Sequence, residues 1–227
     1  MEKLIDSLLY LHIIAGSVSL ILFWIPAFAR KQKGLHTLVG KWYVFLMWVV
    51  VITAGLLSIN NFVIERYNIA FLLGYLSLVT ANPLWFAIGV MKSKKTYTNS
   101  FLFTFVILHV SIVFFGAALL TYGLFFIETS ARYLMIIFGS LGVLDIRQLL
   151  NLKMMRTSRP DWYKMHYSGM IITGIAAYTA FFAFGGSRFF ENILKDEWQL
   201  IPWILPTVIG ITCIRIMKRK RRILQHG

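Results

Sequence analysis

Long apolar segments separated by short charged ones dominate this sequence. A helix that crosses the hydrocarbon core of a bilayer needs about 20 mostly apolar residues. Seven segments meet this requirement: 8–28, 38–59, 69–91, 101–124, 133–152, 167–186 and 200–217. Their apolar residues do not alternate with polar ones, as the strands of a membrane β-barrel would require. The sequence therefore predicts an all-α, polytopic membrane protein, a seven-helix bundle that forms one domain over residues 1–227.

Composition excludes the two other broad classes of chain. Apolar residues make up 58% of the 227 residues, and charged residues only 14%. A soluble domain of this size cannot bury that much apolar surface in one core. A disordered chain contains far fewer apolar side chains. Both classes are therefore excluded.

The distribution of basic residues predicts the orientation of the chain. With the N-terminus outside, the segments on the cytoplasmic side hold 18 of the 23 Lys and Arg residues. Seven of the nine acidic residues fall on the outer side. Lys and Arg collect on the cytoplasmic side of membrane helices, so we expect an outer N-terminus and a cytoplasmic C-terminus. The net charge of +14 then follows from topology, and we expect no nucleic-acid partner.

A run of basic residues, Lys218–Arg222, follows the last apolar segment. This run helps to fix the orientation of the last helix. It is also expected to attract anionic lipids, by about 1 kcal/mol for each basic group near the surface. The predicted partners are therefore the lipid bilayer and its anionic lipids, and the sequence names no protein partner.

Four histidines and one aspartate lie in or beside the apolar segments. His12 lies in the outer half of the first segment and His109 within the fourth. His36 and His166 each open a segment at the cytoplasmic surface, and Asp145 lies in the fifth. A rise of 1.5 Å per residue places all of these except His12 in the cytoplasmic half of the membrane.

The predicted site combines His36, His109 and His166, with Asp145 nearby. Neutral imidazole is a common protein ligand for zinc, copper and haem iron. An ionisable group inside a membrane is costly and suggests a functional site. The site is therefore predicted to bind a transition metal or haem, provided that the helices are neighbours. A dense ligand motif such as H-E-x-x-H is absent from the sequence, which leaves the cofactor unidentified.

A structural interpretation of these residues stays open. His36 and His166 can meet headgroups or backbone at the membrane surface, and His109 can form a hydrogen bond to a neighbouring helix. Asp145 is expected to pair with a basic group or a histidine on another helix. No nucleophile and base occur at a recognisable spacing, so no catalytic residue is predicted and enzymatic activity is left open.

His12 is expected to face the interior of the bundle. Ala15 and Gly16 lie about one turn further along and allow another helix to approach closely. A buried imidazole needs a polar partner. A hydrogen bond between helices is favoured over a role as a ligand. The candidate partners at similar depth are Tyr178, Thr179 and Tyr75.

Two further features concern helix packing. Gly169, Thr173 and Ala177 recur every four residues and form a face of small residues for close packing against another helix. In the third segment, Pro83 follows Asn82 and cannot donate a hydrogen bond to the carbonyl of Val79. The sequence therefore predicts a polar kink at this point.

The stretch Leu11–Gly55 resembles the opening of an uncharacterised bacterial family of polytopic membrane proteins, a domain of unknown function. In related proteins an arginine tends to follow the histidine of a His-x3-Gly-x2-Tyr box, whereas Thr37 stands here, which weakens the argument for an anion site. The resemblance implies a bacterial inner-membrane protein and no established activity. The residues that carry it are His12, Ala15, Gly16, His36, Gly40, Tyr43, His166 and the run Gly169–Phe181.

Three functions are consistent with the sequence. The favoured one is a histidine-ligated protein that binds a metal or haem. The alternatives are a transporter-like carrier and a non-catalytic component that supports the assembly of other membrane proteins. Many carriers consist of two repeats, and seven segments do not divide evenly into two. This counts against the transporter-like carrier.

Overall fold

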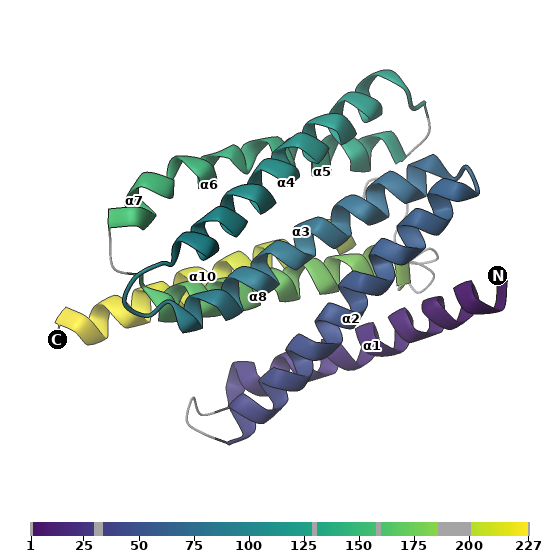
Figure 1. Ribbon diagram of the computed structural model, residues 1–227. Coiled ribbons are helices and arrows are strands. Elements are labelled where there is room, and N and C mark those ends of the chain that lie inside the picture. The colour runs from purple at the N-terminus through teal and green to yellow at the C-terminus, as the bar shows by residue number, and fades with distance from the viewer. Residues whose placement is uncertain (1, 30–33, 129–130, 158–159, 186–200, 227) are drawn as a thin grey trace.

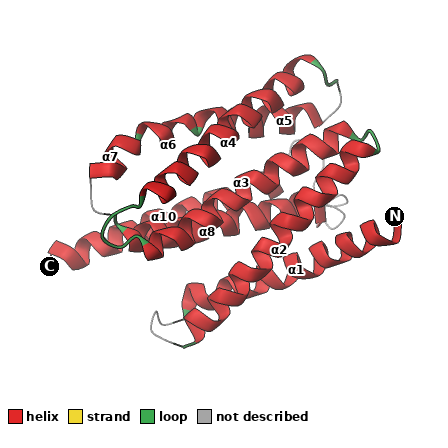
Figure 2. Cartoon of the chain, viewed as in Figure 1, coloured by secondary structure: helices red, strands yellow, loops and turns green. Residues whose placement is uncertain are grey.

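The structure is a computed structural model of the chain, and it describes residues 2–29, 34–128, 131–157, 160–185 and 201–226. Within these ranges the chain forms helices and short connections, without a strand (Figure 2). The all-α class predicted from the sequence is therefore confirmed.

Most helices follow the apolar segments and extend them by a few residues (Figure 1). The fifth segment is the exception, because three shorter helices follow one another along a bent path. The elements are α1 (Glu2–Phe28), α2 (Leu35–Val63), α3 (Tyr67–Lys92), α4 (Asn99–Phe125), α5 (Ala131–Leu144), α6 (Ile146–Leu150), α7 (Leu152–Thr157), α8 (Trp162–Ala180), the π-helical η1 (Phe181–Gly185) and α10 (Ile201–His226).

Six stretches of the described chain are helical, long and apolar enough to cross a membrane. They correspond to α1, α2, α3, α4, the run Arg132–Thr157 and α10. The described part of the predicted segment 167–186, residues 167–185, lies in α8 and η1 and is not among the six. Its helix is short and begins with polar residues that include Lys164 and His166. The structure therefore supports a multi-pass membrane protein, with six sufficiently apolar helical stretches among the described residues.

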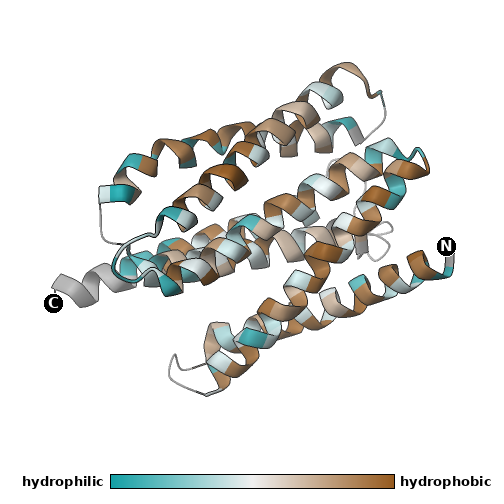
Figure 3. Ribbon diagram, in the orientation of Figure 1, coloured by the Kyte–Doolittle hydropathy of each residue, from teal (hydrophilic) through white to brown (hydrophobic). Residues whose placement is uncertain are grey.

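The helices pack around α3. This helix contacts α2, α4 and α8, while α5 packs against α4, and α10 against α8 (Figure 1). Apolar residues run along the helices, and polar residues gather near their ends (Figure 3). Large apolar side chains such as Ile21, Phe103 and Phe114 are exposed on the outside. Such a surface suits a hydrocarbon environment, because lipid tails are as apolar as these side chains.

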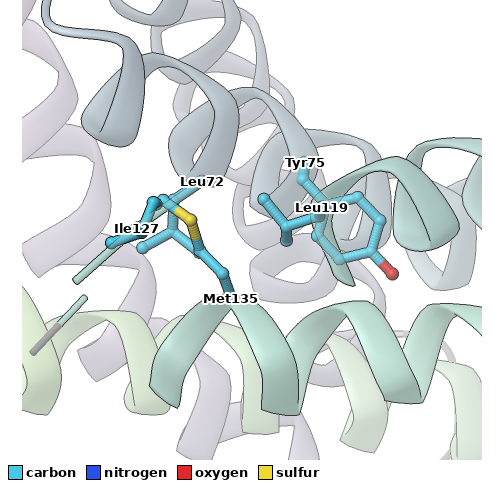
Figure 4. Packing of buried hydrophobic residues seen from close by; sticks show 5 residues of the cluster. All are labelled: Leu72, Tyr75, Leu119, Ile127 and Met135. Carbon is cyan, nitrogen blue, oxygen red and sulfur yellow. The ribbon is translucent and has the colours of Figure 1, made fainter. Parts of the chain in front are cut away.

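Buried apolar side chains form three clusters along the bundle. The first joins α3, α4 and α5 (Figure 4). The second lies towards the opposite ends of α3 and α4 and includes Val90 and Phe105. The third centres on Tyr43, Met47 and Leu84 of α2 and α3. The members of the first cluster are Leu72, Tyr75, Leu119, Ile127 and Met135.

Glycines bring the backbones of α4 and α5 into direct contact. A Cβ atom built on Gly139 would lie 2.5 Å from the backbone nitrogen of Leu120. A Cβ atom on Gly116 would lie 2.8 Å from the Cα atom of Gly142. Any larger residue would push the two helices apart, since backbone atoms cannot rotate away. Close packing through small residues is typical of membrane helices.

The predicted face of small residues on α8 packs against α3. A Cβ atom on Gly169 would lie 2.8 Å from the Cβ atom of Ala87. One turn further along, Thr173 is fully buried and donates a hydrogen bond to the Gly169 carbonyl at 2.9 Å. The prediction that this face allows close approach of another helix is confirmed.

Candidate functional site

The structure joins two of the predicted site residues where α4 packs against the end of α5. His109 lies within α4, and Asp145 lies between α5 and α6. The Nδ1 atom of His109 contacts the Oδ2 atom of Asp145. The side chain of His109 is 7% exposed and that of Asp145 is 21% exposed. The expectation that Asp145 pairs with a histidine on another helix is confirmed.

Asp145 stands at a break in the helix. Its backbone N–H donates to the Gly142 carbonyl at 3.1 Å, three residues back instead of four. A second break follows at Asn151, whose N–H donates to the Gln148 carbonyl at 3.1 Å. The sequence from 131 to 157 contains no proline, so a proline kink explains neither break. Irregular backbone at membrane depth is tolerated where protein or a cavity surrounds it.

Asn82 of α3 lies on the other side of the imidazole. Its Nδ2 atom is 3.4 Å from the Nε2 atom of His109, a long contact. The Oδ1 atom of Asn82 is buried and has no hydrogen-bond partner among the described residues. Both ring nitrogens of His109 therefore face a polar group, a carboxylate on one side and an amide on the other.

The Asn82 amide can serve either charge state of the histidine. In the orientation described, the NH2 group donates to Nε2, and the ring proton on Nδ1 faces Asp145. After a half-turn of the amide, its oxygen would accept a hydrogen bond from a protonated Nε2. An imidazolium would need a hydrogen-bond acceptor for its Nε2–H, and the unpaired Oδ1 atom of Asn82 can provide it.

Phe105 covers the imidazole from within α4. Its ring centroid is 4.2 Å from that of His109, four residues further along. Phe105 is itself 3% exposed and belongs to the second apolar cluster. The His109–Asp145 pair therefore lies beside an apolar cluster, where electrostatic interactions are stronger than in water.

The two other predicted ligands, His36 and His166, lie elsewhere. The Nδ1 atom of His36 is 2.9 Å from the carbonyl oxygen of Pro26, near the end of α1. The Nδ1 atom of His166 is 2.9 Å from the carbonyl oxygen of Ala87 in α3. In each case the imidazole donates to backbone of a neighbouring helix, as in the structural interpretation of these two residues.

The described residues contain no group of three or more His, Cys, Asp or Glu side chains that could hold a metal ion. The structure thus assembles only the His109–Asp145 part of the predicted set of His36, His109, His166 and Asp145. Metal or haem binding at this set stays a prediction.

His12 has the interhelical hydrogen bond that we expected, with a different partner. Its Nδ1 atom is 2.9 Å from the Oγ1 atom of Thr53 in α2. The Thr53 hydroxyl donates to the Val49 carbonyl at 2.7 Å, so its oxygen accepts from the imidazole. The three candidate partners were wrong because α1 packs mainly on α2, whereas those candidates belong to α3 and α8.

Sequence reasoning missed Asn82 and Thr53 as partners of the two histidines. The sequence indicates Asn82 only as part of a polar kink beside Pro83. Each of these residues is a polar side chain within a long apolar run, which is the one feature of the sequence that could have indicated a partner. Many such side chains, however, form hydrogen bonds only within their own helix. No family model, curated protein or solved structure matches this chain.

Proposed function

We propose that this protein is a membrane carrier in which the His109–Asp145 pair binds and releases a proton. The observation that carries the proposal is a buried imidazole held between a carboxylate and an amide. Ionisable groups inside membrane helices are expensive, face the bundle interior and commonly relay protons.

Charge counting shows why the pair suits this role. The described arrangement, a neutral imidazole beside a carboxylate, carries one negative charge. One further proton makes the pair neutral overall, either as two neutral groups or as an imidazolium with a carboxylate. Loss of that proton leaves one negative charge in a low-dielectric site, where unpaired charge is strongly unfavourable. Proton uptake and proton release therefore favour different arrangements of the groups around the pair. The break at Asp145 offers a place for this movement, since discontinuous helices form the sites of many transporters.

The proposal includes seven membrane crossings with an outer N-terminus. The asymmetry of Lys and Arg supports this orientation. The packing of α8 between α3 and α10 supports its passage through the membrane beside them. The bacterial inner membrane is proposed as the location, from the resemblance described above. Reporter fusions after Lys95 and Arg222 should report the cytoplasm, and a fusion after Glu65 the exterior.

Infrared difference spectroscopy tests the proton site directly. Spectra of the purified protein are compared over a series of pH values. Carboxyl and imidazole bands should change together, and Asp145→Asn should remove the carboxyl change. Glu128→Gln is the matched control, because Glu128 is an exposed carboxylate beyond the end of α4. An unchanged spectrum in the Asp145 variant would contradict the proposal.

Metal or haem binding is the second candidate function. A histidine that ligates a metal usually donates its other ring N–H to a carboxylate, as His109 does to Asp145. The Nε2 atom and the unpaired Oδ1 atom of Asn82 would then be the available donors. His36 and His166 would have to leave their carbonyl partners to join them. Metal analysis and an absorption spectrum of the protein in mild detergent test this role, with His109→Ala as the variant that should lose the signal.

A further inference from the structure

Residues from three helices meet in two layers beside the break at Asp145. In the first layer, a Cβ atom built on Gly142 of α5 would lie 2.0 Å from the Tyr75 hydroxyl oxygen and 2.9 Å from the Cα atom of Gly116 in α4. The hydroxyl of Tyr75, which belongs to α3, therefore lies against α5 at Gly142. The second layer consists of the residues of the proposed proton site, which are Asn82 of α3, His109 of α4 and Asp145.

Asp145 lies between these two layers. The layers are seven residues apart along both α3 and α4, which corresponds to about 10 Å on a helix. Only three residues, or about 5 Å, separate Gly142 from Asp145. Asp145 has helical backbone angles, φ −65° and ψ −14°, and a helical side chain leans towards the N-terminal end of its helix. The carboxylate of Asp145 is therefore placed near the turn of Gly142, against which the Tyr75 hydroxyl lies.

One oxygen of the Asp145 carboxylate lacks a hydrogen-bond donor among the described residues. The Oδ2 atom contacts His109, whereas the Oδ1 atom makes no hydrogen bond to any of them. Arg147, two residues further along, is exposed, and the described part of the chain contains no ion pair between it and Asp145. An ionised carboxylate accepts hydrogen bonds on both oxygens. The Oδ1 atom can therefore accept a bond that His109 does not provide.

Tyr75 has an unused donor on the same turn. Its hydroxyl makes no hydrogen bond to any residue that the structure describes. Its ring is buried in the first apolar cluster, and the hydroxyl lies at the edge of that cluster (Figure 4). The carboxylate of Asp145 is near enough to act electrostatically on this hydroxyl. An O–H donor and a carboxylate oxygen, neither of them bonded to a described residue, thus lie close together at the break in the helix.

We propose that Tyr75 is a positioning residue of the proton site, whose hydroxyl donates a hydrogen bond to the Oδ1 atom of Asp145. A turn of the carboxyl group about its Cβ–Cγ bond directs Oδ1 towards Gly142 and the hydroxyl. The hydroxyl keeps its proton throughout, so Tyr75 holds the carboxylate and transfers nothing. A hydrogen bond to an ionised acceptor is about twice as strong as one between neutral groups, so this bond weakens when Asp145 takes up a proton.

The proposed bond links the charge of Asp145 to the position of α3. Tyr75 and Asn82 both belong to α3, so a proton that reaches or leaves the pair changes the contacts of this helix in both layers. That the bond responds to proton uptake rests on the proposed function. The bond itself rests on the placement of Tyr75 beside Asp145.

Infrared spectroscopy of the full-length protein in mild detergent tests this bond from the side of Asp145. The carboxyl bands of Asp145 are isolated as the difference between each protein and the same protein with Asp145→Asn. Tyr75→Phe removes the donor and keeps the ring, so these bands should shift. Tyr122→Phe is the matched control and should leave them unchanged, because the Tyr122 hydroxyl donates to Asn68 Oδ1 at 3.0 Å. No shift in Tyr75→Phe, or an equal shift in both variants, would overturn the proposal.

A second measurement reads the bond from the side of Tyr75. Tyrosine that carries a heavy carbon isotope at the hydroxyl-bearing ring position marks the C–O band, and subtraction of Tyr75→Phe isolates the band of Tyr75. The position of this band depends on whether the hydroxyl donates a hydrogen bond. Asp145→Leu removes the acceptor and should move the band to that of a free hydroxyl, while the band of Tyr122 stays in place. A Tyr75 band that Asp145→Leu does not move would likewise contradict the bond.

Spectra over a series of pH values separate the two proposals. The Tyr75 band should change together with the carboxyl bands of Asp145. Asp145 bands that titrate, yet are not shifted by Tyr75→Phe, would overturn the role of Tyr75 and leave the proton site standing. Asp145 bands that never titrate, but shift in Tyr75→Phe, would contradict the proposed function and leave the bond standing.

Discussion

His12 and His109 are both histidines within long apolar helices, yet their surroundings differ. His12 of α1 is half-buried and donates to the hydroxyl of Thr53. His109 of α4 is buried and contacts the carboxylate of Asp145. The first bond joins two neutral groups, whereas the second joins groups that can both change charge. A histidine within a membrane helix thus acquires its role from its partner.

This comparison sets a contact between neutral groups against one that we propose to bind and release a proton. The hydrogen bond between His12 and Thr53 joins α1 to α2 whether or not Asp145 carries a proton. The His109–Asp145 pair changes its net charge whenever a proton enters or leaves. Substitutions at the two sites should therefore differ in size and in kind.

The largest effect is expected for His109→Leu. It leaves the carboxylate of Asp145 without its partner inside the bundle. Breaking a buried ion pair costs about 3–5 kcal/mol, and partial exposure of Asp145 favours the lower end of that range. Thermal unfolding in detergent measures the loss. The double variant His109→Leu/Asp145→Leu should recover most of it, and a single variant as stable as the wild type would contradict the assigned pair.

A smaller effect is expected when α4 and α5 are forced apart. Gly139→Ala places a methyl group against the backbone of Leu120, and overpacking of this kind costs about 1–3 kcal/mol. The shift should also disturb the infrared signature of Asp145, while the contact between His12 and Thr53 is kept. Gly40→Ala is the control, because a Cβ atom at Gly40 meets nothing within 4 Å. Equal stability of the two variants would show that the close α4–α5 contact is not required.

The fold was largely predictable because the length of an apolar run almost fixes a membrane helix. The segment 101–124, for example, became α4 at Asn99–Phe125. The breaks in the fifth segment were not predictable, since neither Asp145 nor Asn151 is a helix breaker of the strength of proline. The polar start of α8 likewise sets it apart from the six more apolar stretches.

The site was predictable only in part. Sequence spacing gives the depth of a residue in the membrane, and depth placed His36, His109, His166 and Asp145 in one half. Which helices are neighbours is decided by packing, and glycines bring α4 to α5 while α8 packs on α3. For this reason Asp145 meets His109, and His166 meets a backbone carbonyl of α3. A single sequence does not show which helices pack against each other.

The smallest effect is expected at His12. His12→Ala removes one hydrogen bond between helices, and such bonds in membrane proteins contribute roughly 0.6–2 kcal/mol. Thr53→Val removes the same bond from the other side with little change in shape. If the bond is the whole role of His12, the double variant should be about as stable as the less stable of the two single variants. The infrared change of Asp145 and any bound metal or haem should stay as in the wild type. Loss of a cofactor with unchanged stability would instead make His12 a ligand, and the contrast with His109 would disappear.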